Sequence, residues 1–258
     1  MAVTIAVANQ KGGVGKTTTT ANLAVTLARH DLRVLVIDTD PQSNLTSSFG
    51  LDKAVSPSLA DSLLHRDAEL PRYRVQDSTD VAIDLVPGTP ELAAVESELQ
   101  TKLGREMRLR EHVMRIDNDY DYVLVDTPPS LGVLTLNALV AAQWVIIPTE
   151  ARFFSLRGLQ MLTESIEEVT IVNPNLRVLG IVLNKFDRRL REEKHVAGYL
   201  QEQWEAEMFA SRIPTNSKIL EASSSGLSIF APGARGRGVR RAVDAYEALA
   251  EEVLTRAA

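Results

Sequence analysis

Eight consecutive residues near the N-terminus, Lys11–Thr18, contain two lysines, three glycines and two threonines. An apolar segment, Val3–Ala8, precedes them and a helical pattern, Thr17–Arg29, follows. Glycines let the backbone curl until successive N–H groups face inward, and such a loop binds phosphate oxygens. Lys16 would supply charge to the β- and γ-phosphates of a nucleotide, and the Thr17 hydroxyl is placed to ligate Mg²⁺.

The loop departs from the ordinary phosphate-binding pattern, G-x-x-x-x-G-K-[ST], which requires a glycine where this chain has Gln10. A second lysine, Lys11, opens the loop instead. The alternative interpretation is a glycine-rich turn that binds nothing. The strand–loop–helix context disfavours it.

Two other apolar segments end in carboxylates. Val34–Asp38 is followed at once by Thr39 and Asp40, and Tyr122–Asp126 ends in a single aspartate. Carboxylates at the carboxyl ends of parallel strands lie beside a bound phosphate, where they can orient the attacking water or contact Mg²⁺ through water. A solvated turn is the alternative interpretation for the segment around Asp40.

Strand-like and helix-like segments alternate along the rest of the chain. Further strands are expected at Val81–Val86, Trp144–Pro148 and Val178–Leu183, and further helices at Pro90–Arg115, Val133–Ala141, Leu156–Val172 and Glu192–Ala206. The strands are nearly continuous apolar runs, which is typical of strands buried on both faces. The alternation predicts one α/β domain, residues 1–258, with a mainly parallel sheet covered by helices on both faces. Val55–Arg74 is expected to be an insertion on that domain.

The composition excludes several classes of protein. The 258 residues contain no cysteine, which excludes disulfides, thiol nucleophiles and cysteine-held iron–sulfur clusters. The four histidines lie far apart in sequence, so a zinc enzyme is not expected. The net charge of −6 argues against a uniformly basic surface. The longest apolar stretch, Ala138–Pro148, is too short to span a bilayer, and no signal peptide is visible, so a cytoplasmic location is expected.

The K-G-G-x-G-K-T-T loop resembles the deviant phosphate loop of the ParA/MinD superfamily of P-loop ATPases. The resemblance implies ATP and Mg²⁺ as ligands, with Asp40 positioning the hydrolytic water and Asp38, Thr17 and Asp126 around Mg²⁺. It implies that Lys11 and Lys16 act in catalysis, Lys11 by reaching across a dimer interface to the partner's nucleotide. The implied nucleotide-binding residues of the loop are Lys11, Gly12, Gly13, Val14, Gly15, Lys16, Thr17 and Thr18.

Two later segments resemble the positions at which members of this superfamily hold adenine. Asn184 matches a residue that hydrogen-bonds the edge of the base, and Pro214 and Asn216 match residues that touch it. The alternative interpretation of Pro214 is that it simply ends a strand.

The end of the chain favours one branch of the superfamily. MinD-type proteins end in a basic amphipathic helix that inserts in a membrane, whereas the last helical pattern here carries acidic residues such as Glu247 and Glu251 on its polar face. This helix is expected to pack on the sheet. No helix-turn-helix pattern precedes the phosphate loop, so the chain resembles the short, chromosomal ParA/Soj type.

The ParA resemblance assigns a non-specific DNA-binding face to Arg189 and Lys218. The Arg235–Arg241 cluster either contributes to this face or caps and packs the final helix. Solvated surface is the alternative interpretation for these charges. The implied function is chromosome partitioning: Mg-ATP closes a homodimer on nucleoid DNA, and hydrolysis stimulated by a ParB-type partner releases it, without a membrane. A MinD-like membrane regulator and a metabolic P-loop enzyme remain the alternatives.

Overall fold

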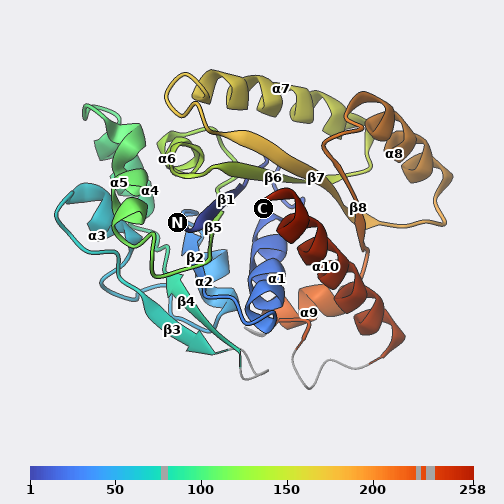
Figure 1. The fold of residues 1–258 in the computed structure, drawn as a ribbon, viewed down its shortest axis with the longest axis horizontal. Coiled ribbons are helices and arrows are strands. Elements are labelled where there is room, and N and C mark those ends of the chain that lie inside the picture. The colour runs from blue at the N-terminus through green and yellow to red at the C-terminus, as the bar shows by residue number, and fades with distance from the viewer. Residues whose placement is uncertain (77–80, 225–227, 231–235) are drawn as a thin grey trace.

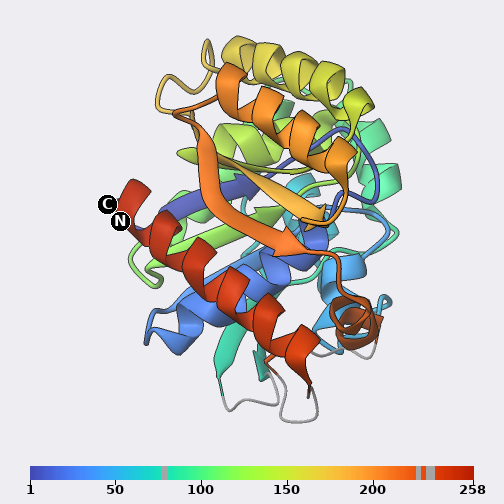
Figure 2. The same ribbon diagram turned by 90° about the vertical axis from the view of Figure 1, so that its right-hand side faces the viewer.

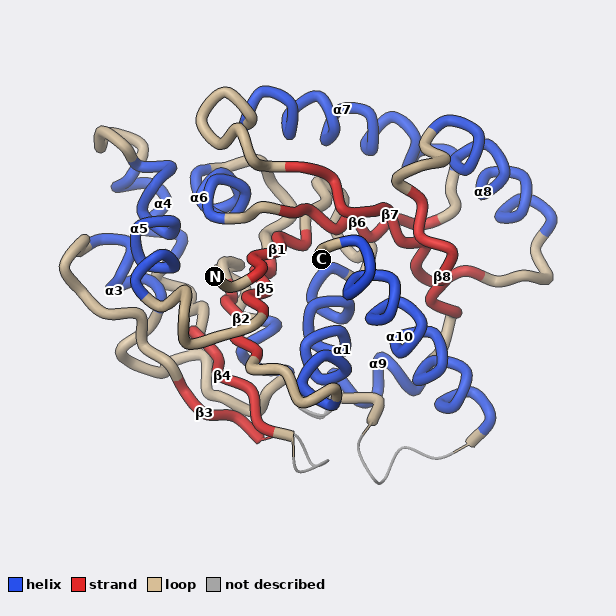
Figure 3. Tube along the Cα trace, in the orientation of Figure 1, coloured by secondary structure: helices blue, strands red, loops and turns tan. Residues whose placement is uncertain are grey.

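The fold is known from a computed structural model, which describes residues 1–76, 81–224, 228–230 and 236–258. Among these residues, eight strands form one sheet in the order β3-β4-β2-β5-β1-β6-β7-β8 (Figures 1 and 3). The strands are β1 Val3–Val7, β2 Val34–Asp38, β3 Tyr73–Gln76, β4 Ala82–Val86, β5 Tyr122–Asp126, β6 Trp144–Glu150, β7 Arg177–Phe186 and β8 Met208–Pro214. All neighbours pair in parallel except β3 and β4, which are antiparallel. The predicted mainly parallel sheet is confirmed.

Helices cover both faces of the sheet (Figure 1). One face carries α1 Lys16–Arg29, α2 Asn44–Ser48, α9 Ser217–Ser224 and α10 Arg237–Arg256. The other carries α3 Leu59–Leu64, α4 Leu92–Leu99, the 3-10 turn Arg105–Met107, α5 Arg108–Arg115, α6 Val133–Ala141, α7 Phe153–Val169 and α8 Arg191–Gln203. Each face has its own apolar cluster, so the central strands β2 and β5 are buried along their whole length.

The predicted single helix over Pro90–Arg115 is wrong. The first helix ends at Leu99, and Gly104 adopts a left-handed conformation with φ 63° before the chain turns into α5. A glycine takes that conformation at little cost, so the helical pattern is interrupted there. The strands β3 and β8 were not predicted because they lie at the edges of the sheet and mix polar with apolar residues.

The last helix packs as its pattern predicted. The helix α10 lies against α1 and β8 (Figure 2). Its apolar side chains Val239, Ala242, Tyr246, Leu249 and Val253 are buried. Arg240, Arg241 and Asp244 of this helix are exposed, whereas Glu252 accepts hydrogen bonds from Ala210 N and Ser211 N of β8, so the helix completes the core of the domain. Within the described part of the chain, no helix has the length and apolar character needed to cross a membrane.

Candidate nucleotide site

The phosphate loop joins β1 to α1 and bends at two glycines in the left-handed region. Gly13 has φ 75° and Gly15 has φ 95°. A Cβ atom on Gly15 would lie 2.7 Å from Nδ2 of Asn184, so this position admits no side chain while Asn184 keeps its place. The backbone N–H of Thr19 already donates to the Gly15 carbonyl at 2.9 Å, which starts the first turn of α1 directly after the loop.

Lys16 is buried beneath the loop. Only 7% of the residue is exposed, and its Nζ donates to the Lys11 carbonyl oxygen at 3.4 Å. Burial lowers the pKa of Lys16, and the nearby charges of Asp126 and Asp40 oppose that shift. The ammonium therefore lies between the loop backbone and two carboxylates, where it can meet a phosphate.

Asp126 is held at the end of β5 by two hydroxyl groups from α1. Thr17 Oγ1 donates to Asp126 Oδ2 at 2.6 Å, and Thr20 Oγ1 donates to Oδ1 at 3.2 Å. Complete burial, together with the negative charge of Asp38, raises the pKa of Asp126 to about 8. A divalent cation beside this carboxylate would favour its ionised form and so oppose the shift, and Thr17 and Asp126 form a donor pair that fits Mg²⁺.

Asp38 and Asp40 differ in what surrounds them. Asp38 lies opposite Asp126 in the sheet, and its carboxylate accepts hydrogen bonds from Thr46 N (2.8 Å), Thr46 Oγ1 (2.7 Å) and Asp40 N (3.1 Å). Burial raises the pKa of Asp38 to about 6 despite these bonds. Asp38 thus fixes the loop that carries Asp40, whose own Oδ1 accepts from Gln42 N at 2.9 Å. The role of Asp38 near Mg²⁺ stays a prediction.

The protein itself offers few metal ligands here. Within the described ranges, no three histidine, aspartate or glutamate side chains converge on one metal position. Mg²⁺ usually keeps several waters and takes one or two carboxylates together with substrate phosphates.

A cavity of about 230 Å³ lies between the loop and the segment after β8. Its lining residues include the three predicted for the base, Asn184, Pro214 and Asn216. Asn184 Nδ2 donates to the Val14 carbonyl at 2.9 Å and to Thr19 Oγ1 at 3.0 Å. Its Oδ1 is buried and has no hydrogen-bond partner among the described residues. A buried acceptor without a partner in a mostly apolar cavity fits the exocyclic amino group of adenine.

Asn216 is already engaged by the protein, because its Nδ2 donates to the Gly238 carbonyl at 2.7 Å and its Oδ1 accepts from Lys218 N at 2.9 Å. It therefore shapes the cavity wall. Tyr246, which no sequence motif assigns to the base, also lines this cavity from α10. It lies 62 residues after Asn184 by their numbers, and only the packing of α10 on α1 brings it there.

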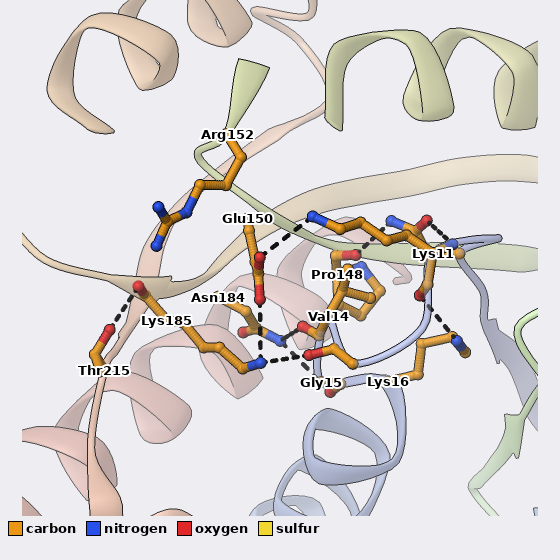
Figure 4. A network of polar contacts seen from close by, with 12 residues as sticks. Lys11, Val14, Gly15, Lys16, Pro148, Glu150, Arg152, Asn184, Lys185 and Thr215 are labelled. Carbon is orange, nitrogen blue, oxygen red and sulfur yellow. Dashed lines mark hydrogen bonds and ion pairs between the residues drawn. The ribbon is translucent and has the colours of Figure 1, made fainter. Parts of the chain in front are cut away.

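Lys11 opens the loop, but its side chain leaves the phosphate site (Figure 4). Its backbone N–H donates to Asn9 Oδ1 at 2.9 Å, and its Nζ lies 3.4 Å from Glu150 Oε2. The side chain is 43% exposed. Of the two predicted lysines, the structure therefore brings Lys16 into the chain's own site and leaves Lys11 at the rim.

Known proteins share this arrangement over the whole chain. Residues 2–178 match a family model described as an AAA domain. The chain is 36% identical over 255 residues to the chromosome partitioning protein ParA of Myxococcus xanthus, covering 98% of this chain and 88% of that protein. It is 37% identical over 250 residues to the sporulation initiation inhibitor protein Soj of Bacillus subtilis, covering 96% of this chain and 97% of that protein. The chain belongs to the ParA/Soj family of P-loop ATPases.

Two solved structures are also similar to this chain. A cobyrinic acid a,c-diamide synthase from Mycobacterium smegmatis with bound ADP and magnesium is 34% identical, with a TM-score of 0.84, covering 98% of this chain and 94% of that chain. The septum site-determining protein MinD of Pyrococcus horikoshii, complexed with Mg-ADP, is 25% identical, with a TM-score of 0.78, covering 98% of this chain and 96% of that chain. These likenesses bear out the membership in the ParA/MinD superfamily.

The two DNA-binding residues predicted for this ParA/Soj-family chain are exposed, and both form ion pairs. Arg189 Nη2 lies 2.7 Å from Asp187 Oδ2, and Lys218 pairs with Glu221 one helical turn away. The predicted Arg235–Arg241 cluster begins outside the described residues. Its last two members, Arg240 and Arg241, are exposed on α10. Arg241 also lines a groove of about 750 Å³ between β8 and α10, together with Arg188 and Arg212.

Proposed function

We propose that this partitioning ATPase binds Mg-ATP, closes into a homodimer and binds nucleoid DNA without sequence preference. Residues 1–258 act as one ATPase domain in the cytoplasm. Relatives named ParA and the nucleotide-bound structures support the proposal. The observation that carries it is the separation of the two loop lysines: Lys16 faces the chain's own phosphate site, whereas Lys11 lies outside it with an exposed side chain.

Different residues around the site have different roles in ATP hydrolysis. The loop N–H groups and Lys16 hold the phosphates and neutralise charge that develops on them. Thr17 and Asp126 would hold Mg²⁺, which supplies charge neutralisation at the β- and γ-phosphates when bound. Asp40 orients the attacking water from the end of β2, and Asp38 keeps the Asp40 loop in place. Asn184, Pro214 and Asn216 enclose the base.

Dimer formation explains how an acidic chain could bind DNA. With a net charge of −6, one protomer offers few phosphate contacts, and a dimer doubles the number that one footprint can make. Arg189 and Lys218 are exposed. The groove between β8 and α10 carries further arginines, although Asp244, Glu251 and Glu252 also line it. A ParB-type partner would stimulate hydrolysis and so release the DNA.

The proposed function is tested most directly through Lys11, which we propose reaches across the dimer interface to the partner's nucleotide. In Lys11→Ala, nucleotide binding by the monomer should survive, because Lys16 still occupies the site, whereas ATP-dependent dimerisation should fail. Sedimentation with a non-hydrolysable ATP analogue and Mg²⁺ measures the dimer, and titration with a fluorescent nucleotide measures binding. A normal dimer would refute the crossing role.

A metabolic enzyme is the second candidate, because a structure 34% identical is named a cobyrinic acid a,c-diamide synthase. Such an enzyme would turn over a small carboxylate at a high rate without a macromolecular activator. Measuring phosphate release with DNA, with a ParB-type partner and with corrinoid carboxylates separates the two functions. Cosedimentation with anionic liposomes and with plasmid DNA separates the partitioning function from a MinD-like one.

A further inference from the structure

A single carboxylate lies between two lysine side chains at the rim of the phosphate loop (Figure 4). Glu150 Oε2 lies 3.4 Å from Lys11 Nζ, and Glu150 Oε1 lies 3.1 Å from Lys185 Nζ. The Lys185 ammonium also donates a hydrogen bond to the Gly13 carbonyl. Glu150 therefore links the first residue of the loop to a lysine that is itself anchored on the loop.

Strand pairing places Glu150 beside Lys185. Glu150 ends β6 and pairs with Asn184 of β7, so the next residue, Lys185, comes beside it. Lys185 adopts the left-handed region with φ 53°, where the chain turns at the end of the sheet, and its carbonyl accepts from Thr215 Oγ1 at 2.6 Å. The Glu150 side chain is 19% exposed, against 43% for Lys11 and 46% for Lys185.

The carboxylate stays ionised although it is partly enclosed. Burial opposes ionisation, but Lys185, and then Lys11, outweigh it and hold the pKa of Glu150 below its usual range. The two lysines are not equivalent partners. Lys185 is closer to Glu150 and has a second bond to the loop, whereas Glu150 is the one acceptor that the Lys11 side chain has within the described part of the chain. Lys11 is therefore the lysine that can leave.

We propose that Glu150 is a positioning residue that holds the Lys11 ammonium on its own chain, and that Lys185 weakens this hold because it shares the negative charge of the same carboxylate. The inference rests on the proposed crossing of Lys11 to the partner's nucleotide. When Lys11 departs, Glu150 keeps Lys185 as its counter-charge, so the partly buried carboxylate is never left unpaired. An exposed ion pair shifts such an equilibrium by a factor of about two to five, so the contact restrains Lys11 without locking it.

The contact between Glu150 and Lys11 can be tested in the nucleotide-free chain. The rate at which an acylating reagent modifies Lys11, followed by mass spectrometry, reports how firmly its amino group is held. Glu150→Gln should raise the rate about two- to five-fold. Lys185→Gln should lower it, because the carboxylate then serves Lys11 alone. An increase in both variants would mean a general loosening of the loop and would overturn the proposal, as would an unchanged rate in Glu150→Gln.

Glu247→Gln is the matched control. Glu247 also lies between two basic side chains, Arg29 (3.5 Å) and His30 (3.3 Å), at the far end of α1. Its removal should leave the modification rate of Lys11 unchanged. A rise equal to that in Glu150→Gln would show that removing any carboxylate has the same effect, and the specific contact would be refuted.

The affinity of the ATP-dependent dimer tests what the contact between Glu150 and Lys11 does. With a non-hydrolysable ATP analogue and Mg²⁺, Glu150→Gln should lower the dimer dissociation constant about two- to five-fold. A weaker dimer would overturn the proposal, because Glu150 would then be needed in the dimer. If Lys11→Ala dimerises normally, the crossing role fails, and the modification rates still decide whether Glu150 holds Lys11.

Discussion

The Thr17 hydroxyl donates a 2.6 Å hydrogen bond to Asp126, and the two residues lie 109 positions apart in the chain. Thr17 stands in the first turn of α1, directly after the phosphate loop, and Asp126 is the last residue of β5. The sheet brings them together because β1, which leads into the loop, pairs in parallel with β5. This hydrogen bond joins the phosphate loop to the carboxylate for which we propose a role in holding Mg²⁺.

The buried Asp126 should make stability depend on pH. Its pKa is about 8 in the folded chain and near 4 when unfolded, so between these values the folded state holds a proton that the unfolded state has released. The free energy of unfolding of the nucleotide-free chain should therefore fall as the pH rises from about 5 to 8. The asparagine of the Asp126→Asn variant cannot titrate, so the free energy of unfolding of the variant should rise relative to that of the parent across this range. At pH 8 the expected difference is about 1–3 kcal/mol.

Urea unfolding of both proteins at several pH values, without Mg²⁺ or nucleotide, checks this. Asp38, with its pKa raised to about 6, contributes in the same direction in both proteins and cancels in the difference. A difference between variant and parent that stays constant from pH 5 to pH 8 would contradict the prediction.

Asp40→Ala should stop hydrolysis while leaving ATP binding and dimerisation intact, because we propose that Asp40 orients the attacking water and lies outside the phosphate loop. The expected loss of turnover is about 100-fold or more. Single-turnover phosphate release measures it. Lys16→Ala is the comparison and should lose nucleotide binding itself. Parental turnover in Asp40→Ala would show that another group positions the water.

Asn184→Ala should weaken ATP binding by about ten-fold and reduce the preference for ATP over GTP, because Oδ1 of Asn184 can accept from an amino group but not from a 6-oxo group. Competition titrations with both nucleotides give the ratio. Asn173→Ala is a matched control, because Asn173 is a buried asparagine whose Nδ2 donates to the Leu139 and Ala142 carbonyls away from the site. Asn173→Ala should lower the stability of the fold and leave the ratio of ATP to GTP affinity unchanged. An unchanged ratio in Asn184→Ala would remove Asn184 from base recognition.

DNA binding should require ATP and fall sharply between roughly 50 and 200 mM salt. Arg189→Ala or Lys218→Ala should lower the slope of log affinity against log salt by about one unit for each DNA phosphate that is no longer neutralised, counting both protomers, and leave dimerisation unchanged. Gel-shift titrations at several salt concentrations measure the slope.

Arg177→Ala serves as the control for these titrations. It removes an exposed arginine at the amino end of β7, whose guanidinium donates to the Pro174 and Leu176 carbonyls. Its slope should equal that of the parent. Equal affinity with ADP and ATP, or no effect of removing Arg189 and Lys218 together, would leave these residues as ordinary solvated surface.

Local residue patterns were enough to predict the central strands and the phosphate loop. Val34–Asp38 and Tyr122–Asp126 were predicted to the residue, because a strand buried on both faces must be apolar throughout and its polar end marks where it stops. The loop was visible because its chemistry is local: glycines, a lysine and a threonine act within a few bonds of one another. The edge strand β8, which mixes polar and apolar residues, gave no such signal.

Local patterns did not indicate which distant side chains share the site or what each one contacts there; this required the folded structure. No pattern in the chain indicates that Glu150 lies between Lys11 and Lys185, or that Tyr246 of α10 lines the cavity beside Asn184. These relationships depend on the order in which the strands pair and on how α10 crosses the sheet. Strand order and helix packing are set by contacts between residues far apart in sequence, which local patterns do not encode.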